Sequence, residues 1–315
     1  MDNNQTRQTL ETRRRQFLQG AAMTALAGSF LANKAKSATD RPRLGVVIDA
    51  VRKENPDAAV ARVHNFNLPT CQVHVGMSPP GLAAPLREAL SKYNVEATAV
   101  MTLEPGKKIW NFKDGPRTIG IVPRDTRSAR IDALKRASDL AKQCNIGAVH
   151  THCGFIPEDP NDPLYEESVA ALRDIGSHCK ANGQHFLMET GQETPITLLR
   201  AIEDTGLDNI GANLDTANLI LYGKGEPVGA LDVLGKHVLG LHAKDGLYPT
   251  DPSKLGQEVA IGKGRVDFPQ VMRQLKDLNY TGPITIEREI SGPRQEEDIR
   301  QSVSYLNGLI EKVYG

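Results

Sequence analysis

The stretch Gly240-Leu241-His242-Ala243-Lys244-Asp245 ends a short apolar run, residues 238–241, with a histidine and then a charged loop. Three other apolar runs in the second half of the chain close on a side chain that can bind a metal, at Glu189, Asp215 and Glu287. If these runs are parallel strands, their last residues meet at one end of a sheet, where α/β proteins place their chemistry. Three carboxylates and one imidazole meeting there would form an oxygen-rich site for a divalent metal.

The same strand-like pattern recurs through the rest of the chain. Apolar runs at residues 44–49, 70–75, 95–103 and 147–152 precede those that end at Glu189, Asp215, His242 and Glu287. Segments with helical periodicity alternate with them, which is typical of repeated βα units and a parallel sheet. We therefore predict a single (β/α)8 TIM barrel over residues 39–315. A doubly wound open sheet is the alternative, but no Gly-rich phosphate loop follows the first predicted strand.

Composition and charge favour a globular protein with a small substrate. Charged residues make up 24% of the chain and the AVILMFWYC set 39%, which is ordinary for a globular protein. The formal net charge is +0, but residues 1–38 hold six basic and two acidic side chains, so residues 39–315 carry a formal charge of −4. A mildly acidic mature domain suits a small neutral substrate, and we expect no nucleic-acid partner.

The N-terminus carries an export signature. Residues 12–18, Thr-Arg-Arg-Arg-Gln-Phe-Leu, resemble the twin-arginine motif, and a modestly apolar run and small residues around Ala38 follow. We predict a signal peptide over residues 1–38 and a mature domain that is periplasmic or otherwise exported already folded. A disordered basic tail is the alternative. The apolar run is short and rich in Ala and Gly, so no membrane contact is expected after signal removal.

The four cysteines, Cys71, Cys144, Cys153 and Cys179, show no metal-ligand spacing. An exported protein could pair them. Folding before export takes place in a reducing cytoplasm, however, which makes disulfides unnecessary. We therefore expect buried free thiols.

A segment rich in Gly, Pro and charge, residues 104–127, interrupts the strand–helix alternation. It holds Phe112 and Trp110, the only tryptophan of the chain. Loops of this length are uncommon unless they have a function, so a lid or one wall of a substrate pocket is our interpretation, with Trp110 stacking on a sugar face. An elaborated surface loop is the alternative.

Five motifs together resemble the sugar phosphate isomerase/epimerase-like family, the TIM barrels related to xylose isomerase and endonuclease IV. They are Met188-Glu189-Thr190-Gly191-Gln192-Glu193, Leu214-Asp215-Thr216-Ala217-Asn218, Leu241-His242-Ala243-Lys244-Asp245, Gly262-Lys263-Gly264-Arg265-Val266-Asp267-Phe268 and Gly282-Pro283-Ile284-Thr285-Ile286-Glu287. Their order and their places at strand ends carry the resemblance, which spans residues 44–315.

The resemblance implies one divalent metal bound by Glu189, Asp215, His242 and Glu287. This donor set suits Mn²⁺, Mg²⁺ or Co²⁺ better than a structural zinc, although Zn²⁺ is an alternative. The reaction it implies is proton abstraction next to the carbonyl of a carbohydrate or keto-sugar, through a metal-stabilised enediolate. Glu189 and Glu287 carry over as the acid/base pair, with Glu289, two residues on, as an alternative to Glu287.

Two positions depart from the family epimerases. Asn218 stands where they commonly have a histidine, and shortly after His242, where they often have an arginine, this chain offers Lys244, Asp245 and Tyr248. Because both family residues help to bind or polarise the substrate, a keto-sugar lyase or hydratase using the same site is the alternative reaction. A non-catalytic sugar-binding barrel is a further alternative. An endonuclease IV-like enzyme would need three metals and a basic face, which the charge argues against.

Further polar residues at strand ends are candidates for contacting the substrate. His150 and His152 share a face of the fourth predicted strand and His74 ends the second, although structural histidines are the alternative. Lys244 could serve as an electrophile or proton donor, or be solvated. The substrate-binding candidates are therefore His74, Trp110, His152, Asn218 and Lys244. Family members often associate, so a homo-oligomer is compatible with the resemblance.

Overall fold

The computed structural model describes residues 40–51 and 54–315, so the predicted signal peptide lies outside the described residues. Residues 39–315 form one compact unit. Within the described ranges, none of the helices combines the length and the apolar composition that crossing a bilayer requires.

Eight parallel strands form a closed barrel in the order β1-β10-β7-β6-β5-β4-β3-β2. The strands are β1 (Arg43–Asp49), β2 (Thr70–His74), β3 (Glu96–Met101), β4 (Ala148–His152), β5 (His185–Glu189), β6 (Ile210–Asp215), β7 (Val238–Ala243) and β10 (Pro283–Ile286). The first strand pairs in parallel with both the second and the last, which closes the ring. The predicted (β/α)8 barrel is confirmed.

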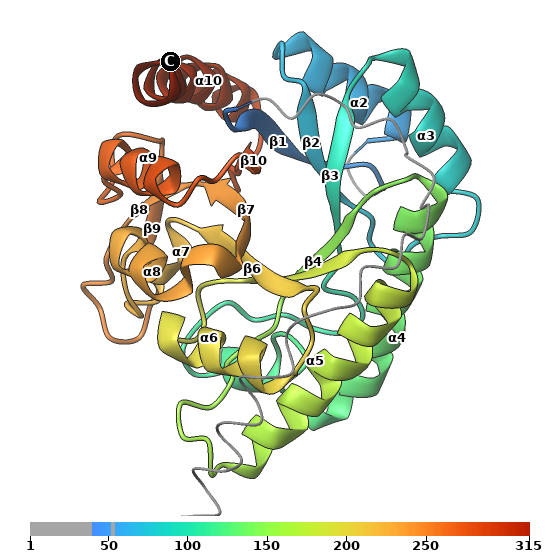
Figure 1. The fold of residues 1–315 in the computed structure, drawn as a ribbon, viewed down its shortest axis with the longest axis vertical. Coiled ribbons are helices and arrows are strands. Elements are labelled where there is room, and N and C mark those ends of the chain that lie inside the picture. Colours follow the sequence, from blue (N-terminus) through green and yellow to red (C-terminus); the bar gives the residue numbers. More distant parts are fainter. Residues whose placement is uncertain (1–39, 52–53) are drawn as a thin grey trace, which may run out of the picture. The chain divides into compact units, whose positions relative to one another are not determined.

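Helices lie around the strands as an outer layer (Figure 1). The long ones are α2 (Pro56–Asn65), α3 (Ala83–Lys92), α4 (Arg124–Gln143), α5 (Pro163–Ala181), α6 (Pro195–Asp204), α8 (Pro227–Leu234), α9 (Phe268–Asp277) and α10 (Pro293–Tyr314). Proline in the first turn and a polar N-cap start several of them. Thr194 caps α6 in this way, because its side chain accepts a hydrogen bond from the Thr197 main chain.

The main core lies between the strands and this layer of helices. Side chains from strands and helices alike are fully buried in it, for example Ile48 of β1, Leu86 of α3 and Leu172 of α5. A separate small cluster joins Ala99, Ala148 and Leu187 on the neighbouring strands β3, β4 and β5. Burial on both faces explains why the strands read as nearly continuous apolar runs.

The predicted irregular segment 104–127 is too long at its C-terminal end. Helix α4 begins at Arg124, so the last turn of the predicted segment is helical, and a 3-10 turn, η1 (Gly115–Arg117), lies inside the segment. The first turn of α4 is wholly polar, so it carries no hydrophobic periodicity. Arg124 and Arg127 instead bind Glu167 of α5, each at 2.6 Å, which stabilises that turn between the two helices.

The segment after β7 also contains structure that the sequence analysis did not predict. An antiparallel hairpin forms from β8 (Asp245–Leu247) and β9 (Gln257–Val259).

The connection before β7, between β6 and β7, holds α8, the short helix α7 (Asn218–Leu221) and a 3-10 turn, η2 (Gly235–His237). The two strands of the hairpin, α7 and η2 are too short to show a clear periodicity.

Asp245 explains the glycine-rich motif that follows this hairpin. Its carboxylate accepts hydrogen bonds from the main-chain N–H groups of Gly262, Gly264 and Val266, at 2.9, 2.8 and 3.1 Å. A Cβ on Gly264 would lie 2.0 Å from the Asp245 carboxylate, so only glycine fits there. The motif is therefore a loop folded around one buried carboxylate.

The four cysteines are buried and free. The prediction of unpaired thiols is confirmed.

Candidate metal and substrate site

The structure brings the four predicted metal ligands together. Glu189 ends β5, Asp215 ends β6, His242 lies near the end of β7, and Glu287 directly follows β10. One ligand atom of each lies within 4.8 Å of the others. These strands are neighbours in the barrel, and the register pairs Asp215 with His242, so the parallel sheet itself aligns the side chains.

The atoms that face the centre of this cluster fit a cation. Gln72 Oε1 accepts a hydrogen bond from His242 Nε2 at 2.7 Å, so His242 Nδ1 points to the carboxylates. The Nδ1 atom lies 3.3 Å from Glu189 Oε1, 3.4 Å from Glu287 Oε2 and 3.7 Å from Asp215 Oδ2. Among the described residues, His242 Nδ1 and Asp215 Oδ2 have no hydrogen-bond partner. Buried polar atoms rarely stay unpaired, and this donor set suits Mn²⁺, Mg²⁺ or Co²⁺.

The electrostatics of the cluster support the same conclusion. Burial lowers the pKa of His242, but the carboxylates of Glu287 and Glu189 outweigh this and raise it well above its usual value. Three carboxylates in a site closed to solvent attract positive charge strongly, because water does not screen them. A divalent cation satisfies that demand with three anionic ligands and one neutral imidazole.

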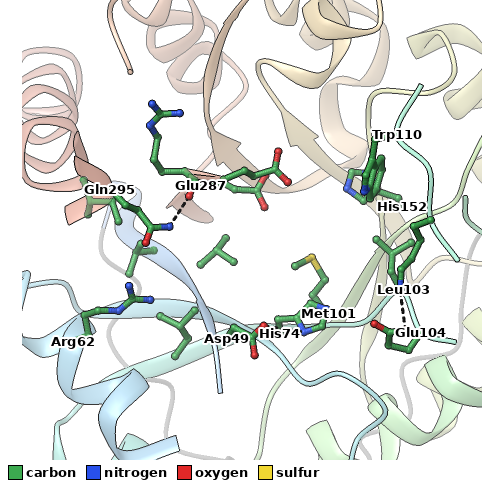
Figure 2. A pocket seen from close by; sticks show the side chains of 17 residues that line it. Asp49, Arg62, His74, Met101, Leu103, Glu104, Trp110, His152, Glu287 and Gln295 are labelled. Atoms are coloured by element: carbon green, nitrogen blue, oxygen red, sulfur yellow. Dashed lines mark hydrogen bonds and ion pairs between the residues drawn. The ribbon is translucent and has the colours of Figure 1, made fainter. Parts of the chain in front are cut away.

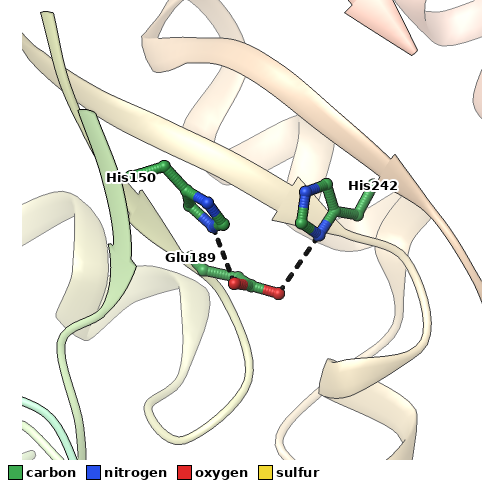
Figure 3. A group of neighbouring side chains, drawn as sticks. All are labelled: His150, Glu189 and His242. Atoms are coloured by element: carbon green, nitrogen blue, oxygen red, sulfur yellow. Dashed lines mark hydrogen bonds and ion pairs between the residues drawn. The ribbon is translucent and has the colours of Figure 1, made fainter. Parts of the chain in front are cut away.

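Glu189 is held by four side chains. His150 Nε2 lies 2.7 Å and His152 Nε2 3.1 Å from its Oε2 atom, and Asn218 donates to Oε1 at 3.1 Å. His150 and His242 lie on opposite sides of the carboxylate (Figure 3). Burial raises the pKa of Glu189, but the neighbouring histidines outweigh this and hold it well below its usual value. Glu189 is therefore an ionised carboxylate in a fixed orientation.

Lys244 is buried, so the alternative of a solvated lysine is wrong. Only 1% of the residue is exposed, and its ammonium donates to Glu289 at 2.6 Å, to Glu287 at 3.1 Å and to Asn218 at 3.3 Å. Since Asn218 also donates to Glu189, the pair Lys244 and Asn218 links the two candidate acid/base glutamates. Neither is among the described residues that line the open cavity. Lys244 and Asn218, which we predicted to contact the substrate, thus lie behind the candidate metal ligands and away from the open cavity.

Glu289 lies outside the metal cluster. Strand β10 ends at Ile286, so the alternation that would place Glu289 on the face of Glu287 does not extend that far. The Glu289 side chain is 58% exposed and pairs with Lys244 at the edge of the cavity. Glu287, at 8% exposure, is the residue that joins the cluster.

A cavity of about 450 Å³ opens above the cluster, within the range of small-molecule sites. Figure 2 shows Trp110 beside His152 on one side and Gln295 with Arg62 on the other, with Glu287 between them. The candidate base therefore faces the middle of the cavity.

The remaining predicted substrate contacts lie on the cavity wall. His74 ends β2, is 7% exposed and accepts a hydrogen bond from the Gly76 main chain. Trp110 is 44% exposed, and its ring centroid lies 5.0 Å from that of His152 with the planes at 68°. His152 contacts both Trp110 and Glu189, so it joins the cavity wall to the metal cluster.

Gln72 is a site residue that the sequence analysis missed. It accepts from His242 and donates to Asn213 at 3.3 Å, which fixes the imidazole orientation from across the barrel. Partners of this kind are almost always present behind a metal-binding histidine. The available signal was the alternation of β2, which places Gln72 on the same face as His74.

The fold and site define a (β/α)8 barrel with a carboxylate-rich candidate metal centre at the carboxyl ends of its strands. Residues 62–309 match the family described as the xylose isomerase-like TIM barrel, and the chain belongs to that family. The family predicted from the five motifs is confirmed.

Several solved structures share this fold. A xylose isomerase domain protein from Planctomyces limnophilus is 32% identical, with a TM-score of 0.80 over 87% of this chain and 99% of that one. A D-psicose 3-epimerase has a TM-score of 0.64 at 14% identity, over 85% of this chain and 99% of that one. The 3-keto-D-glucoside 4-epimerase YcjR from E. coli has a TM-score of 0.64 at 13% identity, over 85% and 100%. The last two show likeness of fold alone.

Two curated relatives match over part of their length. Protein MJ1311 of Methanocaldococcus jannaschii is 26% identical over 199 residues, which are 59% of this chain and 66% of the relative. YihM of Escherichia coli is 27% identical over 135 residues, which are 38% of this chain and 40% of the relative. The match therefore spans less than two thirds of either relative.

Proposed function

We propose that this protein is a divalent-metal-dependent isomerase or epimerase that acts on a carbohydrate or keto-sugar. The observation that carries the proposal is the buried cluster of Glu189, Asp215, His242 and Glu287, with unpartnered atoms at its centre, below a cavity sized for a small molecule. The names of the D-psicose 3-epimerase and the 3-keto-D-glucoside 4-epimerase, which share the fold, support a sugar as the substrate.

Different residues of the chain remove the proton from the substrate and return it. A divalent metal held by the four ligands would supply a Lewis acid for neighbouring carbonyl and hydroxyl oxygens of the substrate. Glu287 faces the cavity and takes the proton from the carbon next to the carbonyl, and Lys244 beside it stabilises its carboxylate form. Glu189 lies on the other side of His242, where His150 and Asn218 hold it; because it is an ionised carboxylate, it must take up a proton from solvent before it can return one to the carbon.

The cavity wall positions the sugar for this transfer. Trp110 offers an exposed aromatic face to the apolar C–H face of a sugar ring. His74 and His152, each 7% exposed, can hydrogen-bond to its hydroxyl groups. A stacked ring is thereby held with one edge toward Glu287.

One observation favours a keto-sugar lyase or hydratase as the second candidate. Both oxygens of Glu189 already accept hydrogen bonds, and His152, not Glu189, lines the cavity on that side. Elimination of water needs one base and one proton donor for the departing hydroxyl group. Glu287 and His152 suit those two roles, so the same site would release an unsaturated product.

The test is incubation with D-psicose, D-tagatose and a 3-keto-glucoside in D₂O, with Mn²⁺, Mg²⁺ or Co²⁺ added. Deuterium next to the carbonyl together with a new stereoisomer, detected by NMR, supports the isomerase or epimerase. A product lighter by one water, detected by mass spectrometry, supports the lyase. A metal-loaded protein that binds a sugar without exchange or product contradicts both and supports a binding barrel.

We also propose export through the twin-arginine pathway, on the motif at residues 12–18. Replacing Arg14 and Arg15 together by Lys should retain the full-length precursor in the cytoplasmic fraction, whereas Arg7→Lys should not. Equal periplasmic recovery of all three forms would contradict export by this route.

A further inference from the structure

Arg130 is a buried arginine whose partners all belong to one loop. It lies on α4, is 2% exposed, and is among the largest fully buried side chains of the described chain. Its guanidinium donates to four main-chain carbonyl oxygens: Pro105 at 2.9 Å, Lys107 at 3.3 Å, Thr118 at 2.8 Å and Gly120 at 2.6 Å. Burying a charge is costly unless hydrogen bonds replace water, and here the loop between β3 and α4 supplies them.

These four carbonyls lie on both sides of Trp110 in the sequence, two before it and two after it. A single guanidinium therefore closes both ends of the loop formed by residues 105–120. Inside the loop, Thr118 adds a second tie, because its hydroxyl accepts from the Ile109 main chain at 3.1 Å and donates to the Asp114 carbonyl at 2.9 Å. The backbone on either side of Trp110 is thus fixed through Arg130 and Thr118.

The far end of the loop is also tied to the strand end that bears His152. Ile121 donates from its main chain to the Cys153 carbonyl at 2.9 Å. At Gly120 the two backbones run so close that a Cβ would lie 2.0 Å from the Cys153 carbonyl oxygen. The loop that carries Trp110 is thereby placed against the residue that follows His152.

We propose that Arg130 is a positioning residue for substrate binding: by tying residues 105–120, it holds Trp110 against His152 so that the exposed ring forms the wall on which a sugar stacks. The ligand class, a keto-sugar or its glycoside, rests on the proposed function. The position of Trp110 itself rests on the contacts given above. Arg130 acts through Trp110 and does not touch the cavity.

The test compares Arg130→Lys with Arg136→Lys, a matched control at an exposed position of the same helix. Lysine keeps the charge but loses the planar fork that reaches four carbonyls. Because Trp110 is the only tryptophan of the chain, its emission and its quenching by acrylamide report this loop directly. We expect Arg130→Lys to raise the quenching constant and to raise KM for the keto-sugar by about tenfold, the scale of one lost aromatic contact, with kcat and metal content close to those of the wild type.

A double mutant separates positioning from general stability. If Arg130 acts through Trp110, adding Arg130→Lys to Trp110→Ala should raise KM no further than Trp110→Ala alone. If Arg130→Lys does not fold, Thr118→Val loosens the same loop without touching α4, and it should shift quenching and KM in the same direction. Unchanged quenching and KM in the folded variant, despite a lower Tm, would overturn the proposal and leave Arg130 a merely structural residue.

The fluorescence measurements need no substrate, so they distinguish the two proposals. A changed Trp110 signal in a protein that neither binds nor turns over keto-sugars contradicts the proposed function but retains the role of Arg130 in holding the loop. Turnover of a keto-sugar with an unchanged KM and signal in Arg130→Lys contradicts the positioning role alone.

Discussion

The two sides of the barrel mouth are built differently. On the side of β5, β6 and β7, the residues Glu189, Asp215 and His242 are fully buried and come directly from strand ends. Next to them, against His152 at the end of β4, Trp110 is 44% exposed and comes from a loop that a helix holds in place. The strand ends fix a charged cluster through the register of the sheet, whereas the loop forms an open wall.

This difference separates chemistry from recognition. A site built on strands is held more rigidly than one on loops, and loops tolerate more change. We therefore expect changes on the strand side to act on metal affinity and turnover, and changes on the loop side to act on substrate affinity.

The largest effect should come from Glu287. Glu287→Gln removes the cavity-facing carboxylate that is both base and ligand, so kcat should fall by about a thousandfold or more. Glu289→Gln, at the exposed edge, is the matched control and should cost less than about tenfold, since that side chain only pairs with Lys244. Steady-state kinetics on the same keto-sugar decides between them. A larger fall in kcat for Glu289→Gln than for Glu287→Gln would assign the proton transfer to Glu289.

The next largest effect should come from Gln72, which supports the metal ligand His242 from behind. Gln72→Leu leaves His242 Nε2 without its acceptor, and metal affinity should fall by about 10- to 100-fold. Gln184→Leu is the control, because the Gln184 side chain is also buried but hydrogen-bonds to Ser138 and Ile146, away from the site. Competition with a chelator measures the affinity. Equal metal affinity in both variants would mean that Gln72 does not orient the imidazole.

Glu193 tests whether the strand side holds a neutral acid as well as charged ones. Burial raises its pKa to about 8, although a main-chain hydrogen bond and Lys224 lower it. From about pH 4.5 to 8 the unfolded chain loses this proton while the folded chain keeps it, so the free energy of unfolding falls as pH rises. Glu193→Gln removes that dependence. The free energy of unfolding of this variant, relative to that of the wild type, should therefore rise by on the order of 2 kcal/mol between pH 5 and 8.

The measurement for Glu193 is Tm against pH, with Glu203→Gln at an exposed position of α6 as the control. A constant difference in Tm between Glu193→Gln and the wild type across this range would show that Glu193 titrates normally.

Local sequence patterns could predict the barrel and its four candidate ligands, because strand ends in a parallel barrel converge whatever lies between them. Residues that act across the barrel could not be found in this way. Gln72 is 170 positions from His242, and no periodicity relates the two. The burial of Lys244 depends on carboxylates from another strand end, so the sequence alone left its solvation open.

The role of Arg130, on the loop side, could likewise not be predicted from local sequence patterns. In a helical pattern an arginine reads as solvent-facing, yet here carbonyl oxygens of a preceding loop replace water around it. Its role follows from the path of that loop, which hydrophobic periodicity does not encode.

The metal centre is tested most directly by the metal content of the protein purified without chelator, compared between the wild type and Asp215→Asn. We expect about one Mn, Mg, Co or Zn per wild-type chain and none in the mutant, and addition of the ion should raise the Tm of the wild type but not that of the mutant. No bound metal in the wild type, and no stabilisation by any of these ions, would contradict the metal centre at the strand ends.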